Sequence, residues 1–228
     1  MSFSDFIAVR AEAPGGLGLW MAMLVSYVVN PLILPPLVYV MVLAHVGASR
    51  IDVLWGAGIG LVFLALVPLA YVGWMRLQGR IESLEIRDRS KRTEPFLVVL
   101  GAGLAALGMV LGIEVTGQRL LAALVGCHVL NTVVLLLITT RWKISVHCAS
   151  VAGAEATLGF VQSHVPGTVL SPAVVGNGVL AGGAVLVGLV LWARIRSRAH
   201  TFWQAGAGAG LGLVSYAELF ILARFVGL

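Results

Sequence analysis

Residues suited to bind and transfer a phosphoryl group stand at fixed spacing in the segment ARIRSRAHTFWQ, residues 193–204. Five residues separate Arg194 from His200, and three separate His200 from Gln204. An arginine presents a planar fork of donors that matches phosphate oxygens, and an imidazole can attack phosphorus. Positions four apart share one face of a helix, so the Gln204 amide can orient the His200 ring. The segment therefore predicts a phosphate-handling site near the start of a helix.

Two other segments supply related side chains. RDRSKRTEPF, residues 87–96, is rich in cations, and RWKISVHCAS, residues 141–150, contains Ser145 and His147. His147 also lies near a predicted helix start, where free N–H groups and the helix dipole favour an anion. With a second histidine, one ring can attack phosphorus while the other protonates the leaving oxygen. No carboxylate cluster accompanies these segments, which argues against a metal-dependent phosphatase, and we expect neither a bound metal nor another cofactor.

The elements that must position these residues are membrane-spanning helices. Only 11% of the 228 residues are charged, against about 25% in soluble domains, and the mean hydropathy is +0.99. This composition predicts one integral membrane domain over residues 1–228, with residues 1–16 as an interfacial N-terminal segment. We expect an all-α, polytopic bundle of about six or seven spans, because long unalternating apolar runs do not suit a β-barrel. The candidate spans are residues 18–46, 54–77, 95–113, 119–140, 146–165, 172–193 and 201–226.

Several features inside the spans predict local structure. The first span contains NPLILPP, residues 30–36, and must kink or break there. The run AGAGAGLG, residues 205–212, places glycines four apart and predicts close helix packing. Cys127 and Cys148 are interpreted as small buried residues rather than as a disulfide or a zinc site. Polar residues within spans are costly in lipid, and five are expected to face the bundle interior: Asn30, His128, Asn131, Glu155 and Glu218.

The distribution of positive charge predicts the orientation. With seven spans, one face of the membrane holds 12 of the 15 basic residues, and the other face holds Arg50, Arg119 and Arg224. The positive-inside rule therefore places the N-terminus and the three basic segments in the cytoplasm. An even number of spans separates each segment from the next, so all three can converge. We expect a protein of the prokaryotic inner (cytoplasmic) membrane.

Taken together, the three segments resemble the type 2 phosphatidic acid phosphatase superfamily, which includes the vanadium haloperoxidases. Its motifs read K-x6-R-P, then P-S-G-H, then S-R-x5-H-x3-D. The third motif matches best, and its positions are occupied by Ala193, Arg194, His200 and Gln204. The second is retained in part, by Ile144, Ser145, Val146 and His147. In the first, anchored on Pro95, Arg87 stands for the lysine and Glu94 for the arginine, with Lys91 or Arg92 as a neighbouring substitute.

This resemblance implies a membrane-bound helical fold of that superfamily and a metal-independent phosphatase. Its substrate would be a lipid or isoprenoid phosphate or diphosphate, its other partners membrane lipids, and nucleic acid is not expected. His200 would be the nucleophile that forms a phosphohistidine, and His147 the general acid. Gln204 would orient His200 in place of an aspartate, without its charge, and Glu94 is a candidate for compensation. The remaining substrate-binding residues would be Arg194, Arg87, Lys91, Arg92 and Ser145.

Other interpretations of the same residues stay open. Basic loops at a membrane edge occur without function, so a weak or inactive phosphatase-like protein that binds anionic lipid, or a subunit of a membrane complex, is the alternative. A small transporter is a third class, although no inverted repeat is visible. Glu155 is an alternative member of the site, and the pair His128 and His147 an alternative ligand set for haem or a pigment.

Overall fold

The computed structural model describes residues 16–86, 88–171 and 173–227. The expected interfacial segment, apart from Gly16, and the predicted substrate-binding residue Arg87 lie outside these ranges. The described chain consists of helices and connecting loops, without a strand, which confirms the all-α prediction. In order, the elements are α2 (Gly16–Val28), α3 (Leu34–His45), α4 (Arg50–Leu61), the π-helical turn η1 (Val62–Leu66), α5 (Val67–Leu77), the 3-10 turn η2 (Arg89–Lys91), α6 (Thr93–Gly112), α7 (Gln118–Arg141), α8 (Val146–His164), α9 (Ala173–Arg196) and α10 (Phe202–Val226).

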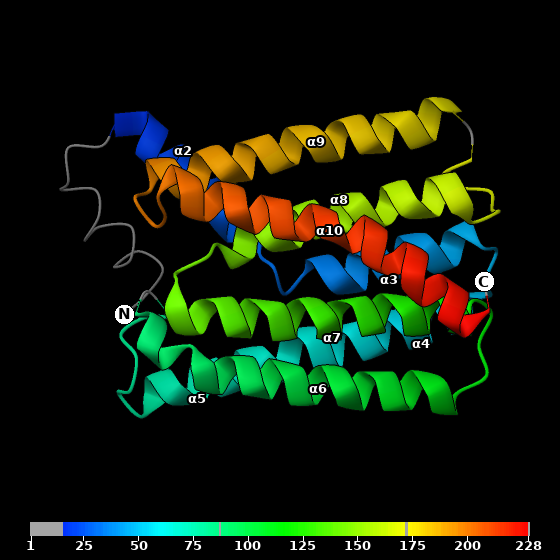
Figure 1. The fold of residues 1–228 in the computed structure, drawn as a ribbon, viewed down its shortest axis with the longest axis horizontal. Helices are drawn as coiled ribbons and strands as arrows, with labels where there is room; N and C mark the ends of the chain where they lie inside the picture. The colour runs from blue at the N-terminus through cyan, green and yellow to red at the C-terminus, as the bar shows by residue number, and fades with distance from the viewer. Residues whose placement is uncertain (1–15, 87, 172, 228) are drawn as a thin grey trace.

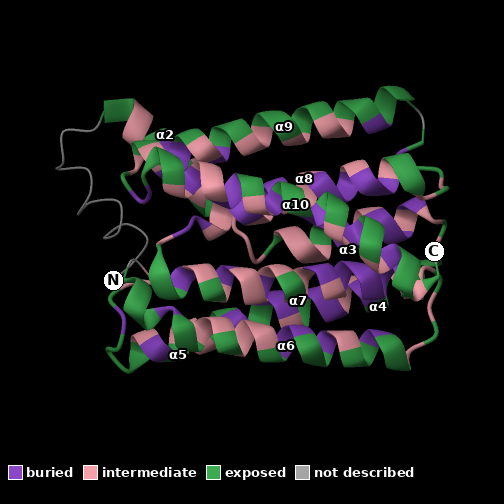
Figure 2. Ribbon diagram, in the orientation of Figure 1, coloured by how far each residue is buried: buried purple, intermediate pink, exposed green. Residues whose placement is uncertain are grey.

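The longer helices form a bundle along the length of the molecule (Figure 1). Five helical stretches are long and apolar enough to cross a membrane: Arg50–Leu77, Arg89–Gly112, and α7, α9 and α10. Many large apolar residues of these helices are exposed, where lipid would cover them. Figure 2 marks exposed residues along the outer helices of the bundle. The fold is compatible with an integral membrane protein. The count of six or seven spans stays a prediction, since α2 and α3 are short and α8 is less apolar.

The predicted break in the first apolar stretch is confirmed. Helix α2 ends at Val28, and α3 begins at Leu34 with prolines in its first turn. Between them the Asn30 side chain accepts a hydrogen bond from the Leu32 N–H (3.0 Å), which satisfies a backbone donor that the break would leave without a partner. Proline suits a first helical turn, where its missing N–H costs nothing.

Close packing of α10 on α8 brings two of the basic segments together. A Cβ added at Gly208 or Gly212 would overlap the backbone carbonyl of Ser145 or Ala149 on α8. Gly208 and Gly212 therefore allow the close helix packing that the glycine-rich run predicted. Gly206 and Gly210 face open space and take no part in it. At the start of both helices the Ser145 N–H donates to the Gln204 carbonyl (3.2 Å).

The interior polar residues also follow the prediction where α7 meets α10. The Asn131 amide donates to Glu218 (2.6 Å) and to the Ser215 hydroxyl (3.1 Å). The Cys127 thiol donates to Glu218 (3.2 Å), and both cysteines are buried and free. These contacts join two helices inside the bundle and leave the polar atoms satisfied.

Candidate functional site

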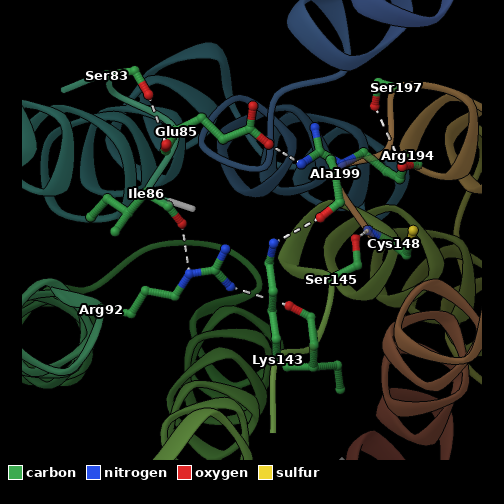
Figure 3. Close-up of polar contacts among 11 residues, drawn as sticks. Ser83, Glu85, Ile86, Arg92, Lys143, Ser145, Cys148, Arg194, Ser197 and Ala199 are labelled. Atoms are coloured by element: carbon green, nitrogen blue, oxygen red, sulfur yellow. Dashed lines mark hydrogen bonds and ion pairs between the residues drawn. The ribbon is translucent and has the colours of Figure 1, made fainter. Parts of the chain in front are cut away.

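At one end of the bundle α6, α8 and α10 begin and α7 and α9 finish (Figure 1). The loops at this end carry a cluster of charged and polar side chains (Figure 3). We call it the end cluster, and it comprises Glu85, Arg92, Lys143, Arg194 and His200. The parity argument predicted this convergence, and the structure brings three of the predicted residues into it.

Arg194 lies in the last turn of α9 and is almost completely buried, with 4% of its surface exposed. One guanidinium nitrogen forms an ion pair with the Glu85 carboxylate, while the buried Nε has no partner among the described residues. The Arg194 carbonyl accepts from the N–H groups of Ala199 (3.1 Å) and His200 (3.2 Å). This tight connection, with Arg198 in the left-handed region (φ 54°), holds His200 beside Arg194.

Arg92 and Lys143 join three loops through backbone carbonyls. The buried Arg92 donates from Nε to the Ile86 carbonyl (2.7 Å) and from a terminal nitrogen to the Ile144 carbonyl (3.4 Å). Lys143 donates to the Ala199 carbonyl (2.8 Å), which ties the α7–α8 loop to the α9–α10 turn. Burial, together with the charges of Arg92 and Arg194, lowers the pKa of Lys143, although Glu85 opposes this. The cations therefore lie close enough to repel one another.

His200 is buried among these cations. Burial, and then the charges of Arg194, Lys143 and Arg92, lower the pKa of His200 to about 3. The ring is therefore neutral at physiological pH, and one of its nitrogens keeps a lone pair that can act as nucleophile or acceptor. Its buried Nδ1 has no hydrogen-bond partner in the described chain.

His147 lies in the first turn of α8, and its ring is hydrogen-bonded to the backbone of Ser26 in α2. Arg194, Glu85 and Arg92 are charged neighbours of this ring, as they are of His200. The two histidines thus share one electrostatic environment. Glu155 lies outside this environment. It is eight residues along α8 from His147, which is about 12 Å of helix, and its carboxylate faces Gly183 of α9.

Two predicted site residues serve the backbone instead. The Gln204 side chain accepts from the Thr201 N–H (3.2 Å), while the Thr201 hydroxyl accepts from the Gln204 N–H (3.3 Å). This capping box satisfies donors that the start of α10 would otherwise leave without partners. No hydrogen bond joins Gln204 to His200, so the expected orienting contact is not formed. Ser145 likewise caps α8, accepting from the Cys148 N–H (3.4 Å).

Lys91 and Glu94 belong to a separate group on the outer side of α6. Glu94 forms an ion pair with Arg80 and accepts from the Tyr71 hydroxyl, and Lys91 donates to the Arg80 carbonyl (2.9 Å). Neither is among the charged neighbours of His200, so Glu94 does not supply the carboxylate that the resemblance requires. We call this group the outer pair, after Arg80 and Glu94.

Sequence reasoning missed two members of the end cluster. Lys143 had been counted only as a basic residue of its loop, although its position two residues before Ser145 placed it near the site. Glu85 had no signal, because the path of the loop between α5 and η2 brings it to Arg194 from 109 positions away in the chain. No protein-family model, curated protein or solved structure matches this chain.

Proposed function

We propose that the end cluster binds the phosphate group of a lipid or isoprenoid phosphate, and that the protein hydrolyses this ester without a metal. The observation that carries the proposal is the convergence of Arg92, Lys143 and Arg194 around a neutral His200. His147 has Arg92, Arg194 and Glu85 as charged neighbours too. These are the groups that binding, attack and protonation of a phosphate ester require.

The charge of the end cluster favours an anionic ligand. Three cations face one carboxylate, Glu85, so three positive charges minus one negative leave an excess of two. Buried cations are costly unless they are paired and hydrogen-bonded. A phosphate dianion matches this excess, and its oxygens can accept from Arg194 in place of Glu85.

In the proposed reaction His147 first takes up a proton from solvent. A ring nitrogen of His200 then attacks phosphorus while the bond to the leaving oxygen breaks, and protonated His147 gives that oxygen its proton. Water then attacks the phosphohistidine, and His147 takes the proton back as inorganic phosphate leaves. His200 regains its lone pair. Since His200 is neutral in the folded protein, no proton need be removed before the attack.

A second candidate function is binding of an anionic lipid without hydrolysis. It is favoured by the use of Gln204 as a helix cap, because the His200 ring then has no side chain to orient it. In this case Arg92, Lys143 and Arg194 bind the anionic headgroup, and His200 lies beside it without reacting.

Phosphate release from purified protein tests the first function and separates it from the second. We expect release from lipid or prenyl phosphates in the presence of EDTA, and its loss in His200→Ala and His147→Ala. The control His164→Ala removes a histidine from the opposite end of α8 and should retain activity. Anionic-lipid binding that depends on Arg194, with no release from any substrate, would support the second function and refute the first.

We also propose that the end cluster faces the cytoplasm, on the charge distribution alone. Cysteines introduced at Ser90 and Ser197 should react with an impermeant reagent in inverted vesicles and not in intact cells. Ready labelling in intact cells would reverse the orientation.

A further inference from the structure

Part of the loop between α5 and η2 contacts two cations of the end cluster (Figure 3). We call this part, residues 81–86, the strap. The Glu85 carboxylate forms the ion pair with Arg194. The carbonyl of the next residue, Ile86, accepts from the Nε of Arg92 (2.7 Å). In the free protein the strap therefore occupies arginine donors that a bound phosphate group would need.

The strap covers cations that are otherwise closed to solvent. Arg92 is 8% exposed, Arg194 4% and His200 7%. The Glu85 side chain keeps 35% of its surface exposed, so it reaches from Arg194 to the outside of the protein. A phosphate group can therefore contact these cations only after a covering segment has moved.

The strap is the segment of the end cluster that can move at the least cost. It is neither helix nor strand, whereas Arg92, Arg194 and His147 lie at helix ends. Its apolar anchor is Ile81, which is buried. Segments with few buried apolar contacts and no regular hydrogen-bond ladder open locally well before the rest of a protein.

The Glu85 carboxylate also lies where the charge of a phosphate group would act. It is a charged neighbour of Arg92, Lys143, His147 and His200, besides its ion pair with Arg194. A carboxylate supplies one negative charge. A phosphate monoester supplies up to two charges and three strong acceptor oxygens, so it can satisfy both arginines where Glu85 pairs with one.

We propose that the strap is autoinhibitory: Glu85 occupies the phosphate position in the free protein, and an entering phosphate group displaces the strap from Arg194 and Arg92. The inference rests on the proposed binding of phosphate by the end cluster, but it does not require hydrolysis. A ligand shifts such an equilibrium only by its preference for the open form. The strap therefore favours phosphate monoesters over singly charged lipids such as fatty acids, whose carboxylate replaces Glu85 without gain.

Cysteine labelling of the full-length protein in detergent tests the inference, since both native cysteines are buried. Ile81→Cys places a thiol at the buried position of the strap. Leu170→Cys places a matched thiol at a buried position of the loop between α8 and α9, at the opposite end of the bundle. We expect inorganic phosphate to accelerate labelling of Ile81→Cys by a hydrophilic maleimide at least about 5-fold, the effect of replacing one net contact. Acetate at equal ionic strength should not, and Leu170→Cys should respond to neither anion.

Two further variants show whether Glu85 holds the strap closed. Adding Glu85→Gln to Ile81→Cys should raise labelling without phosphate about 10-fold, because a charge-assisted contact is lost. Adding Glu94→Gln, from the outer pair, should leave the rate unchanged. Equal rates in the two double variants would overturn the role of Glu85.

Proteolysis reports the same opening in the protein without substitutions. Glu82 lies in the strap, and Glu114 lies in the loop between α6 and α7 at the opposite end; both are exposed. We expect phosphate to accelerate cleavage after Glu82 by a glutamyl-specific protease, relative to cleavage after Glu114. This measurement decides the outcome if Ile81→Cys does not fold.

The results separate failure of the strap from failure of the phosphate site. Saturable calorimetric binding of phosphate, with labelling of Ile81→Cys and cleavage after Glu82 unchanged or slowed, would overturn the autoinhibitory role and leave the phosphate site standing. Absence of phosphate binding would refute the proposed function, and this inference with it. Equal acceleration by acetate would overturn the selectivity for phosphate.

Discussion

Two arginine–glutamate ion pairs lie at the same end of the bundle, and they differ in their surroundings. The outer pair, Arg80 and Glu94, is solvent-accessible, with side chains 40% and 47% exposed. In the end cluster Arg194 is 4% exposed, and its partner Glu85 is 35% exposed. Exposed pairs contribute about 0–1 kcal/mol, whereas a buried cation needs a matched anion. The ion pair itself therefore does not mark a site. Burial combined with an excess of positive charge does.

The largest expected difference between the two pairs is in phosphate release. Arg194→Gln should lower kcat/KM at least about 100-fold, since a charge-assisted hydrogen bond of about 1.5–3 kcal/mol is lost together with neutralising charge. Arg80→Gln should remain within about 2-fold of wild type. Steady-state kinetics on one lipid phosphate measures both. Similar losses in the two variants would show that the difference in burial has no functional meaning.

The next difference concerns the carboxylates. Glu85→Gln removes the anion that competes for Arg194, so inorganic phosphate should bind about 10-fold more tightly, the gain of one charge-assisted contact. Glu94→Gln in the outer pair should leave this affinity unchanged. The inhibition constant of inorganic phosphate measures both. Weaker binding in Glu85→Gln would mean that Glu85 supports the anion site through the loop it holds, and that it does not compete.

A smaller effect is expected in the pH dependence of stability. The pKa of His200 in the folded protein is lowered to about 3, below the value of about 6.5 in an unfolded chain. The stability that the neutral ring contributes is therefore complete above about pH 6.5 and is lost as the pH falls towards 3. The Tm of wild type should drop between pH 7 and pH 5 more than that of His200→Gln.

The control His164→Gln alters a ring at the far end of α8 and should keep the wild-type Tm profile. Identical slopes for wild type and His200→Gln would mean that the folded protein does not suppress protonation of His200.

The smallest effect is expected at Gln204. Because its side chain completes a capping box, Gln204→Leu should cost about 0.5–2 kcal/mol of stability while kcat per folded molecule stays within about 3-fold. Denaturant unfolding and kinetics measure the two quantities separately. A large loss of kcat at unchanged stability would restore the orienting role that the motif assigns to this position.

The sequence predicted the features that depend on helix ends and helix faces. The meeting of Arg194, His200 and Arg92 followed from span parity, and the packing of α10 on α8 followed from glycines four apart. Cap chemistry was visible in Thr201 and Gln204, but the resemblance directed the glutamine towards His200. At a helix start the backbone N–H groups without an intrahelical partner compete with the His200 ring for the Gln204 side-chain oxygen. In this structure the Thr201 N–H donates to that oxygen.

What could not be predicted depends on loop paths. Lys91, Arg92 and Glu94 are near neighbours in the chain, yet Arg92 is the one that lies near Arg194, whereas Lys91 and Glu94 contact Arg80. Glu85 reaches the end cluster across an irregular loop that has no periodicity to read.

Calorimetric titration of the purified protein with inorganic phosphate tests most directly whether the buried cations of the end cluster bind phosphate. We predict saturable binding by wild type and by Arg80→Gln, and affinity at least about 10-fold weaker in Arg194→Gln. A third variant, Arg92→Gln, should weaken binding in the same direction. Equal affinity in wild type and Arg194→Gln, or a loss of binding in Arg80→Gln alone, would contradict the claim.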